Sequence, residues 1–82
     1  MASYSYYKDN KWIDIKAKDI NQVRAKIIKK FGTNIGEVWI ARNDVMVGAI
    51  RYSKTKHRFE WGDNHIPYGK IIPESGRFVS DD

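Results

Sequence analysis

The 82-residue sequence has no cysteine, which excludes disulfide cross-links and thiolate metal sites. No apolar run in it approaches the roughly 20 residues that a membrane-spanning helix requires. The first ten residues, MASYSYYKDN, lack the apolar segment of a secretory signal peptide. From these absences we expect a cytoplasmic protein that does not associate with membranes.

Motifs of catalysis and cofactor binding are also missing. The sequence has no nucleophile elbow, no serine–histidine–aspartate set at usable spacing and no glycine-rich phosphate loop. His57, Glu60, Asp63 and His65 form a compact group of potential metal ligands, but strand residues three apart face opposite ways. We therefore expect no enzyme activity, no metal, no cofactor and no small-molecule substrate.

The composition fits one small basic domain over residues 1–82. Apolar residues make up 41% of the chain, which is enough for a globular core. The net charge of +5 favours long-range attraction to polyanions such as DNA or RNA.

One helix is predicted over residues 19–32. Asp19 can cap its first turn, and Gly32 suits the left-handed residue that ends many helices. Arg24 lies at the edge of the apolar stripe; we expect its stem to pack and its head to reach water, with anion binding as the alternative. The stripe itself should pack on a sheet and consists of Ile20, Val23, Ile27, Ile28 and Phe31.

Aromatic and β-branched residues predict strands on both sides of the helix. Before the helix we expect a hairpin, and after it three further strands joined by turns. The predicted fold is α+β with the order ββαβββ: a curved antiparallel sheet of about five strands with the helix across one face. The predicted strands cover residues 4–7, 12–17, 37–42, 45–52 and 57–61.

The pairing register decides which aromatic residues face outward. A two-residue turn between the third and fourth strands would set Trp39 opposite Gly48, where the ring can shield the exposed backbone. For the fifth strand, a four-residue loop would place Phe59 and Trp61 on the Trp39 face. A three- or five-residue loop would place them on the Val47 face, because a slip of one residue reverses the sides.

Residues 65–82 are predicted to form a mostly irregular tail. Pro67 and Pro73 argue against a helix or a central strand, although a short edge strand near residues 70–72 is compatible with the pattern. The tail should lie across the sheet. Since the face opposite the helix is too apolar to be fully solvated, either this tail or a partner should cover it.

The strongest functional signal is the basic hairpin within residues 51–58. A β-ribbon with a cationic tip can enter a groove or follow a phosphate backbone, and its aromatic side chains can stack on bases. The alternative is a solvated loop whose lysines protect the strand edges. The candidate nucleic-acid-binding residues are Arg51, Tyr52, Lys54, Lys56, His57 and Arg58, with added charge from Lys26 and Lys30 of the helix.

Three tryptophans form the second candidate site. If two of Trp12, Trp39 and Trp61 share the face away from the helix, they form a platform for single-stranded nucleic acid or a protein-binding patch. The alternative is core packing beneath the tail. We therefore expect a small non-enzymatic binding module that contacts nucleic acid through the basic hairpin. The alternative is a protein–protein interaction module or homodimer that uses the aromatic sheet face.

Overall fold

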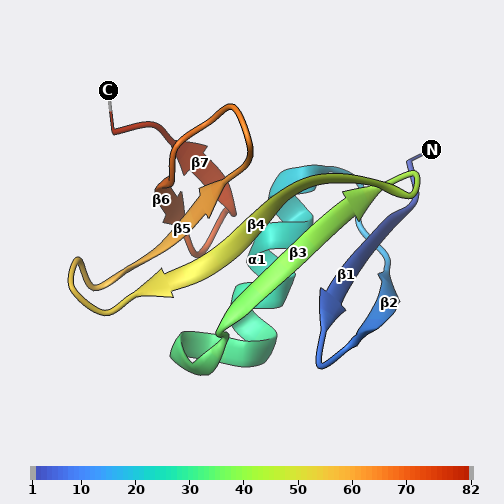
Figure 1. Ribbon diagram of the computed structural model, residues 1–82, viewed down its shortest axis with the longest axis horizontal. Coiled ribbons are helices and arrows are strands. Elements are labelled where there is room, and N and C mark those ends of the chain that lie inside the picture. The colour runs from blue at the N-terminus through green and yellow to red at the C-terminus, as the bar shows by residue number, and fades with distance from the viewer. Residues whose placement is uncertain (1, 82) are drawn as a thin grey trace.

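The computed structural model describes residues 2–81, which form one helix and one seven-stranded antiparallel sheet. The strand order across the sheet is β2-β1-β3-β4-β5-β6-β7 (Figure 1). The expected α+β fold, an antiparallel sheet crossed by one helix, is confirmed. Its elements are β1 (Tyr4–Lys8), β2 (Lys11–Ile15), α1 (Ile20–Phe31), the 3-10 turn η1 (Gly32–Asn34), β3 (Glu37–Arg42), β4 (Val45–Ser53), β5 (Arg58–Gly62), β6 (Gly69–Ile72) and β7 (Arg77–Val79).

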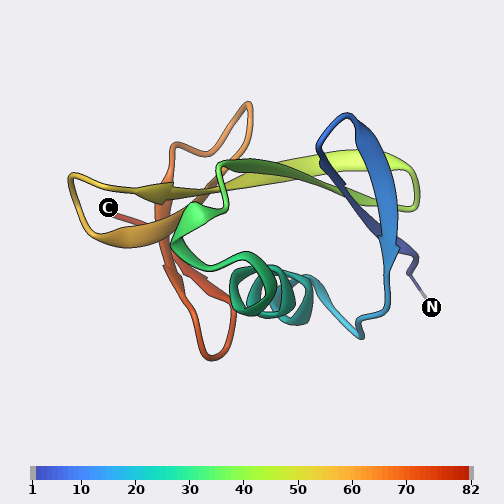
Figure 2. The same cartoon turned by 90° about the horizontal axis from the view of Figure 1, so that it is seen from below.

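The sheet curves around the helix, which lies on its concave side. Figure 2 shows β1 and β2 on one side of α1 and the hairpin of β6 and β7 on the other, with β3 and β4 arching between them. The core fills the space enclosed by this curve. Its fully buried apolar members come from the helix, the following loop and the strands β3, β4 and β6; they include Val23, Ile27, Ile35, Val38, Ile40, Ile50 and Ile71.

Both predicted ends of the helix are confirmed. The Asp19 carboxylate accepts a hydrogen bond from the backbone N–H of Gln22 at 2.8 Å, which satisfies one unpaired donor of the first turn. Gly32 ends the helix with a φ of +64°, and its N–H donates to the carbonyl oxygen of Ile28. These local interactions explain why the position of the helix can be predicted from sequence.

The C-terminal stretch differs from the expected irregular tail. It contains a further hairpin, β6 and β7, and extends the sheet instead of crossing its outer face. The two prolines do not interrupt either strand, because Pro67 precedes β6 and Pro73 lies in the turn that follows it. The strand expected near residues 70–72 is present, but β7 pairs with it and forms the sheet edge.

Because of a β-bulge, the pairing register of β3 and β4 differs from the predicted one. The two-residue turn is present, since Arg42 pairs with Val45. Farther along the hairpin the register shifts by one residue, so that Trp39 lies opposite Ala49 and not opposite Gly48. Val47 is the extra residue of the bulge, and beyond it each side chain of β4 changes sides relative to the unshifted register.

The bulge also decides the direction of Trp61. Four residues separate Ser53 from its partner Arg58, the loop length for which we predicted that Phe59 and Trp61 face the Trp39 side. Because of the shifted register, Trp61 instead pairs with Ile50 on the helix side and is only 4% exposed. A tryptophan does cover Gly48, but it is Trp61: a Cβ at Gly48 would lie 2.4 Å from its ring.

Arg24 joins the helix to the sheet and to the C-terminal hairpin. Its guanidinium lies 4.3 Å from the ring centre of Trp61, and Nη1 donates to the carbonyl oxygen of Gly76 at 3.1 Å. Burial lowers the pKa of Arg24 to about 10, although the nearby Asp19 carboxylate partly offsets this effect. The expectation that the arginine head reaches water is wrong, because Arg24 is only 6% exposed.

Gly76 should be the glycine least tolerant of substitution among those with positive φ. Its φ is +73°, and an added Cβ would lie 1.8 Å from the carbonyl oxygen of Asn21 on the helix. Gly32 is a matched control, with a φ of +64° and nothing within 4 Å of an added Cβ. We expect Gly32→Ala to lower the free energy of unfolding by about 1–3 kcal/mol, because its φ of +64° and ψ of −153° lie in a region that only glycine adopts readily. Gly76→Ala should lower it by about 2 kcal/mol more.

Urea titrations followed by tryptophan fluorescence measure both values. Equal losses for the two variants would contradict the close packing of the β6–β7 turn on the helix.

Candidate functional site

The predicted basic hairpin is the loop between β4 and β5, which projects beyond the body of the sheet (Figure 1). Lys54, Lys56 and His57 are exposed at its tip. His57 adopts a φ of +54°, and the hydroxyl of Ser53 accepts a hydrogen bond from the backbone N–H of Lys56 at 3.2 Å. The loop therefore has a defined conformation that presents two lysines to solvent.

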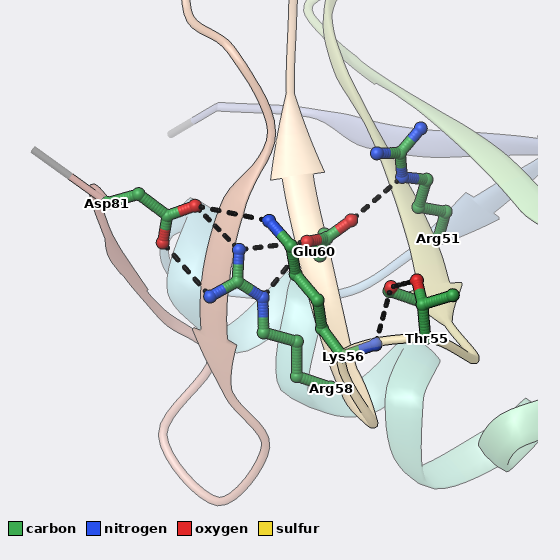
Figure 3. A network of polar contacts seen from close by, with 7 residues as sticks. Arg51, Thr55, Lys56, Arg58, Glu60 and Asp81 are labelled. Atoms are coloured by element: carbon green, nitrogen blue, oxygen red, sulfur yellow. Dashed lines mark hydrogen bonds and ion pairs between the residues drawn. The ribbon is translucent and has the colours of Figure 1, made fainter.

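The arginines at the base of this loop surround a buried carboxylate. Glu60 is 1% exposed and lies between Arg51 and Arg58, whose side-chain nitrogens are each 2.9 Å from its oxygens (Figure 3). Burial alone would raise the pKa of Glu60, but hydrogen bonds and electrostatic attraction from the two arginines outweigh it and lower the pKa. Glu60 is therefore ionised at neutral pH and neutralises part of the predicted basic patch.

A second carboxylate reaches the same loop from beyond β7. Asp81 accepts two hydrogen bonds from Arg58, at 3.0 Å from Nη1 and 2.6 Å from Nη2, and lies 3.9 Å from Nζ of Lys56. These hydrogen bonds, followed by those to Glu60, raise the pKa of Arg58, and the bond from Arg58 lowers the pKa of Asp81. The spacing of residues 81 and 58 in the sequence gives no sign of this pairing.

The remaining candidates for nucleic-acid binding do not join the loop tip. Tyr52 packs edge-on against Phe59, with ring centres 5.0 Å apart, on the helix side of the sheet. Lys26 donates to the backbone carbonyl of Lys16, and Nζ of Lys30 lies 5.8 Å from the ring centre of Phe31. Both lysines belong to α1 on the concave side, so the predicted basic surface is divided.

An aromatic row crosses the opposite, convex face of the sheet. It consists of Trp12, Tyr7 and Trp39, which occupy paired positions on β2, β1 and β3. The ring centre of Tyr7 lies 5.2 Å from that of Trp12 and 5.4 Å from that of Trp39. Trp12 is 49% exposed and Trp39 is 39% exposed.

Of the three tryptophans proposed for this site, Trp12 and Trp39 therefore share the face away from the helix, whereas Trp61 lies on the helix side. Sequence reasoning missed Tyr7 as a site residue. Pairing across the turn at Asp9 and Asn10 places Tyr7 directly opposite Trp12, so the signal was present in the length of that turn.

Two shallow hollows adjoin the aromatic row. The first has a volume of about 420 Å³ and is lined by Ser5, Trp12, Asp14, Ala41, Asp44 and Met46. The second has a volume of about 290 Å³; its lining includes Trp39, Ala49, Gly62 and Tyr68. Small residues on the strands thus form the floors, and larger side chains form the walls.

Carboxylates border the aromatic row although the whole chain is basic. Glu37 accepts a hydrogen bond from the indole N–H of Trp39 at 2.6 Å. Asp14 and Asp44 line the first hollow. Arg51 lies toward the second hollow, where its guanidinium is 3.6 Å from the ring centre of Tyr68. The centre of this face is therefore aromatic, and its border beside Trp12 is acidic.

The group of histidines and acids noted in the sequence does not converge. Glu60 is held between arginines, and Asp63 accepts the backbone N–H groups of His65 and Ile66 at 2.7 Å. Within residues 2–81, no cluster of three or more histidine, aspartate or glutamate side chains is arranged to hold a metal ion.

The same described residues contain no helix of the length and hydrophobicity needed to cross a membrane. Comparison of the chain with protein-family models, curated proteins and solved structures finds no match. Its function must therefore be inferred from its own geometry.

The lowered pKa of Glu60 predicts a specific pH dependence of stability. The unfolded chain binds a proton more readily than the folded protein, so the ionised carboxylate stabilises the fold at neutral pH. We expect Glu60→Gln to lower the free energy of unfolding by about 1–3 kcal/mol at pH 7. This loss should shrink as the pH falls below about 4.3, the ordinary pKa of glutamate, because the wild-type carboxylate is then protonated.

Urea titrations from neutral to acidic pH measure the effect, with Glu74→Gln as a control because Glu74 is exposed. If the difference in free energy of unfolding between wild type and Glu60→Gln stays constant over this pH range, the ionised Glu60 between its two arginines does not stabilise the fold.

Proposed function

We propose that this protein is a non-enzymatic interaction module that binds another protein through the convex face of its sheet, centred on the aromatic row. The observation that carries the proposal is the exposure of Trp12 and Trp39 on either side of Tyr7. Tryptophan and tyrosine contribute most of the binding energy in many protein interfaces. A contiguous exposed apolar patch of this kind marks an interaction site more often than a lone apolar residue does.

The ring geometry favours a protein partner over nucleic acid on this face. The rings of Tyr7 and Trp39 are stacked on each other, with an angle of 24° between their planes. A base cannot enter between rings whose centres are already 5.4 Å apart. The indole N–H of Trp39 is also engaged by Glu37, and the neighbouring carboxylates would repel phosphate groups.

The acidic border indicates the chemistry of the partner. Asp14 and Asp44 stand beside the hollow next to Trp12, and both would attract basic side chains. The partner surface should therefore have an apolar centre that covers the aromatic row and lysine or arginine residues at its margin. We infer that the partner is a different protein; a second copy of the chain is the alternative.

Photo-crosslinking tests where a partner binds. A benzophenone amino acid at Met46, which is 51% exposed beside the first hollow, should form adducts with a discrete protein in cells. The matched control places the same group at Lys29, which is exposed on the helix. Equal adducts from both positions, or adducts with nucleic acid at position 46, would contradict the proposal. A crosslinked dimer of the chain would show that the partner is a second copy of the chain and not a different protein.

Tryptophans on opposite sides of the sheet provide a matched pair of variants. Trp39→Ala should weaken partner binding at least tenfold, as expected for an interface residue worth about 1.4 kcal/mol or more. Because Trp39 is 39% exposed, the free energy of unfolding of the Trp39→Ala protein should be less than about 1.5 kcal/mol below that of wild type. Trp61→Ala should instead destabilise the fold by about 3–5 kcal/mol, the usual cost of removing a buried tryptophan.

Crosslinking yield and urea titration measure the two effects separately. If Trp39→Ala keeps full binding, or if it destabilises the fold as much as Trp61→Ala does, the aromatic row has a structural role instead.

A further inference from the structure

The contact between Arg58 and Asp81 has the geometry of an occupied anion site. Both terminal nitrogens of the guanidinium donate to the carboxylate, at 3.0 Å and 2.6 Å. Arginine binds a phosphate through the same parallel pair of hydrogen bonds. Nζ of Lys56 lies 3.9 Å from the same carboxylate, so that two cations converge on one anion (Figure 3).

The arginine is held in place by groups other than Asp81. Its Nε donates to Glu60 at 2.9 Å, and Glu60 is itself buried and held by Arg51. The guanidinium is therefore fixed along its Nε–Nη2 edge, while its adjacent Nη1–Nη2 edge points toward Asp81. If Asp81 moved away, Arg58 would still present the same pair of donors.

Asp81 is the exchangeable member of this network. It lies beyond β7, outside regular secondary structure, and its side chain is 44% exposed. Asp81 is the more exposed partner, because the side chain of Arg58 is only 19% exposed, so water can solvate the carboxylate when it leaves. An external anion with more than one contact to the loop can therefore displace it.

We propose that Arg58 and Lys56 form a binding site for the phosphates of a nucleic-acid backbone, and that Asp81 occupies this site in the free protein. The neighbouring Lys54 is exposed at the tip of the same projecting loop and would contact an adjacent phosphate. The site shares no residue with the aromatic row. The phosphate site is therefore a second proposal, and its test does not depend on the outcome for the protein interaction.

Charge-matched variants test the proposal. Asp81→Asn and Glu74→Gln each remove one negative charge, but only the first frees Arg58, since Glu74 is exposed and belongs to neither proposed site. We expect Asp81→Asn to bind a labelled single-stranded oligothymidylate of about 20 nucleotides roughly fivefold more tightly than wild type does. Glu74→Gln should change the affinity by less than about twofold.

The salt dependence adds a second measurement. Fluorescence anisotropy at about 50 mM and about 200 mM salt should show a steeper loss of affinity for Asp81→Asn than for wild type, because one more phosphate contact releases one more counterion. Adding Lys56→Gln to Asp81→Asn should remove most of the gain without disturbing the buried Glu60. Circular dichroism checks that all variants remain folded.

Equal affinities for Asp81→Asn and Glu74→Gln would overturn the proposal, because the gain would then follow from net charge alone. Failure of Asp81→Asn to bind the oligonucleotide at low salt would overturn it as well. A labelled polyglutamate peptide is the third arm. If it binds Asp81→Asn as tightly as the oligonucleotide does, the site recognises carboxylates of an acidic peptide, and the assignment to nucleic acid is wrong.

Discussion

The β-bulge at Val47 is the constraint on which the arrangement of both sheet faces depends. It shifts the pairing of β3 with β4 by one residue, so that Ile50 and its partner Trp61 face the helix. Without the extra residue, the same loop length would direct Trp61 outward and would remove the largest aromatic side chain from the core. One inserted residue thus places Trp61 on the face opposite the exposed aromatic row.

On the concave side, Trp61 connects parts of the chain that are distant in sequence. Its ring covers Gly48 of β4 and receives the guanidinium of Arg24 from the helix, which in turn donates to Gly76 of the C-terminal hairpin. A buried arginine is costly unless its charge is compensated. Here the ring face, the Gly76 carbonyl and the side-chain oxygen of Asn21, which accepts from Nη1 at 2.9 Å, offset part of that cost, whereas the buried Nε has no hydrogen-bond partner among the described residues. The close approach of Gly76 to the helix makes its hydrogen bond possible.

The positive charge of the chain is less concentrated than its composition suggests. Arg51 and Arg58 are engaged by Glu60, and Arg58 is also engaged by Asp81. Composition counts these arginines as available to a polyanion, whereas the folded protein uses them to hold a buried carboxylate. The exposed aromatic row and the lysines of the β4–β5 loop remain as two separate surfaces, and we propose that the first binds a protein and the second a phosphate group.

The sequence by itself determined the helix, its two caps, the turns of the first two hairpins and the α+β class, because these depend on periodicity and hydrogen bonds between near neighbours. It also identified Trp12, Trp39 and Trp61 as candidates for an exposed platform, of which Trp12 and Trp39 are exposed. Only the tertiary structure decided the side of Trp61, the pairing of Arg58 with Asp81 and the strands that continue the sheet to Val79. The physical reason is that a one-residue bulge reverses every later side chain, and contacts between distant segments leave no regular spacing in the sequence.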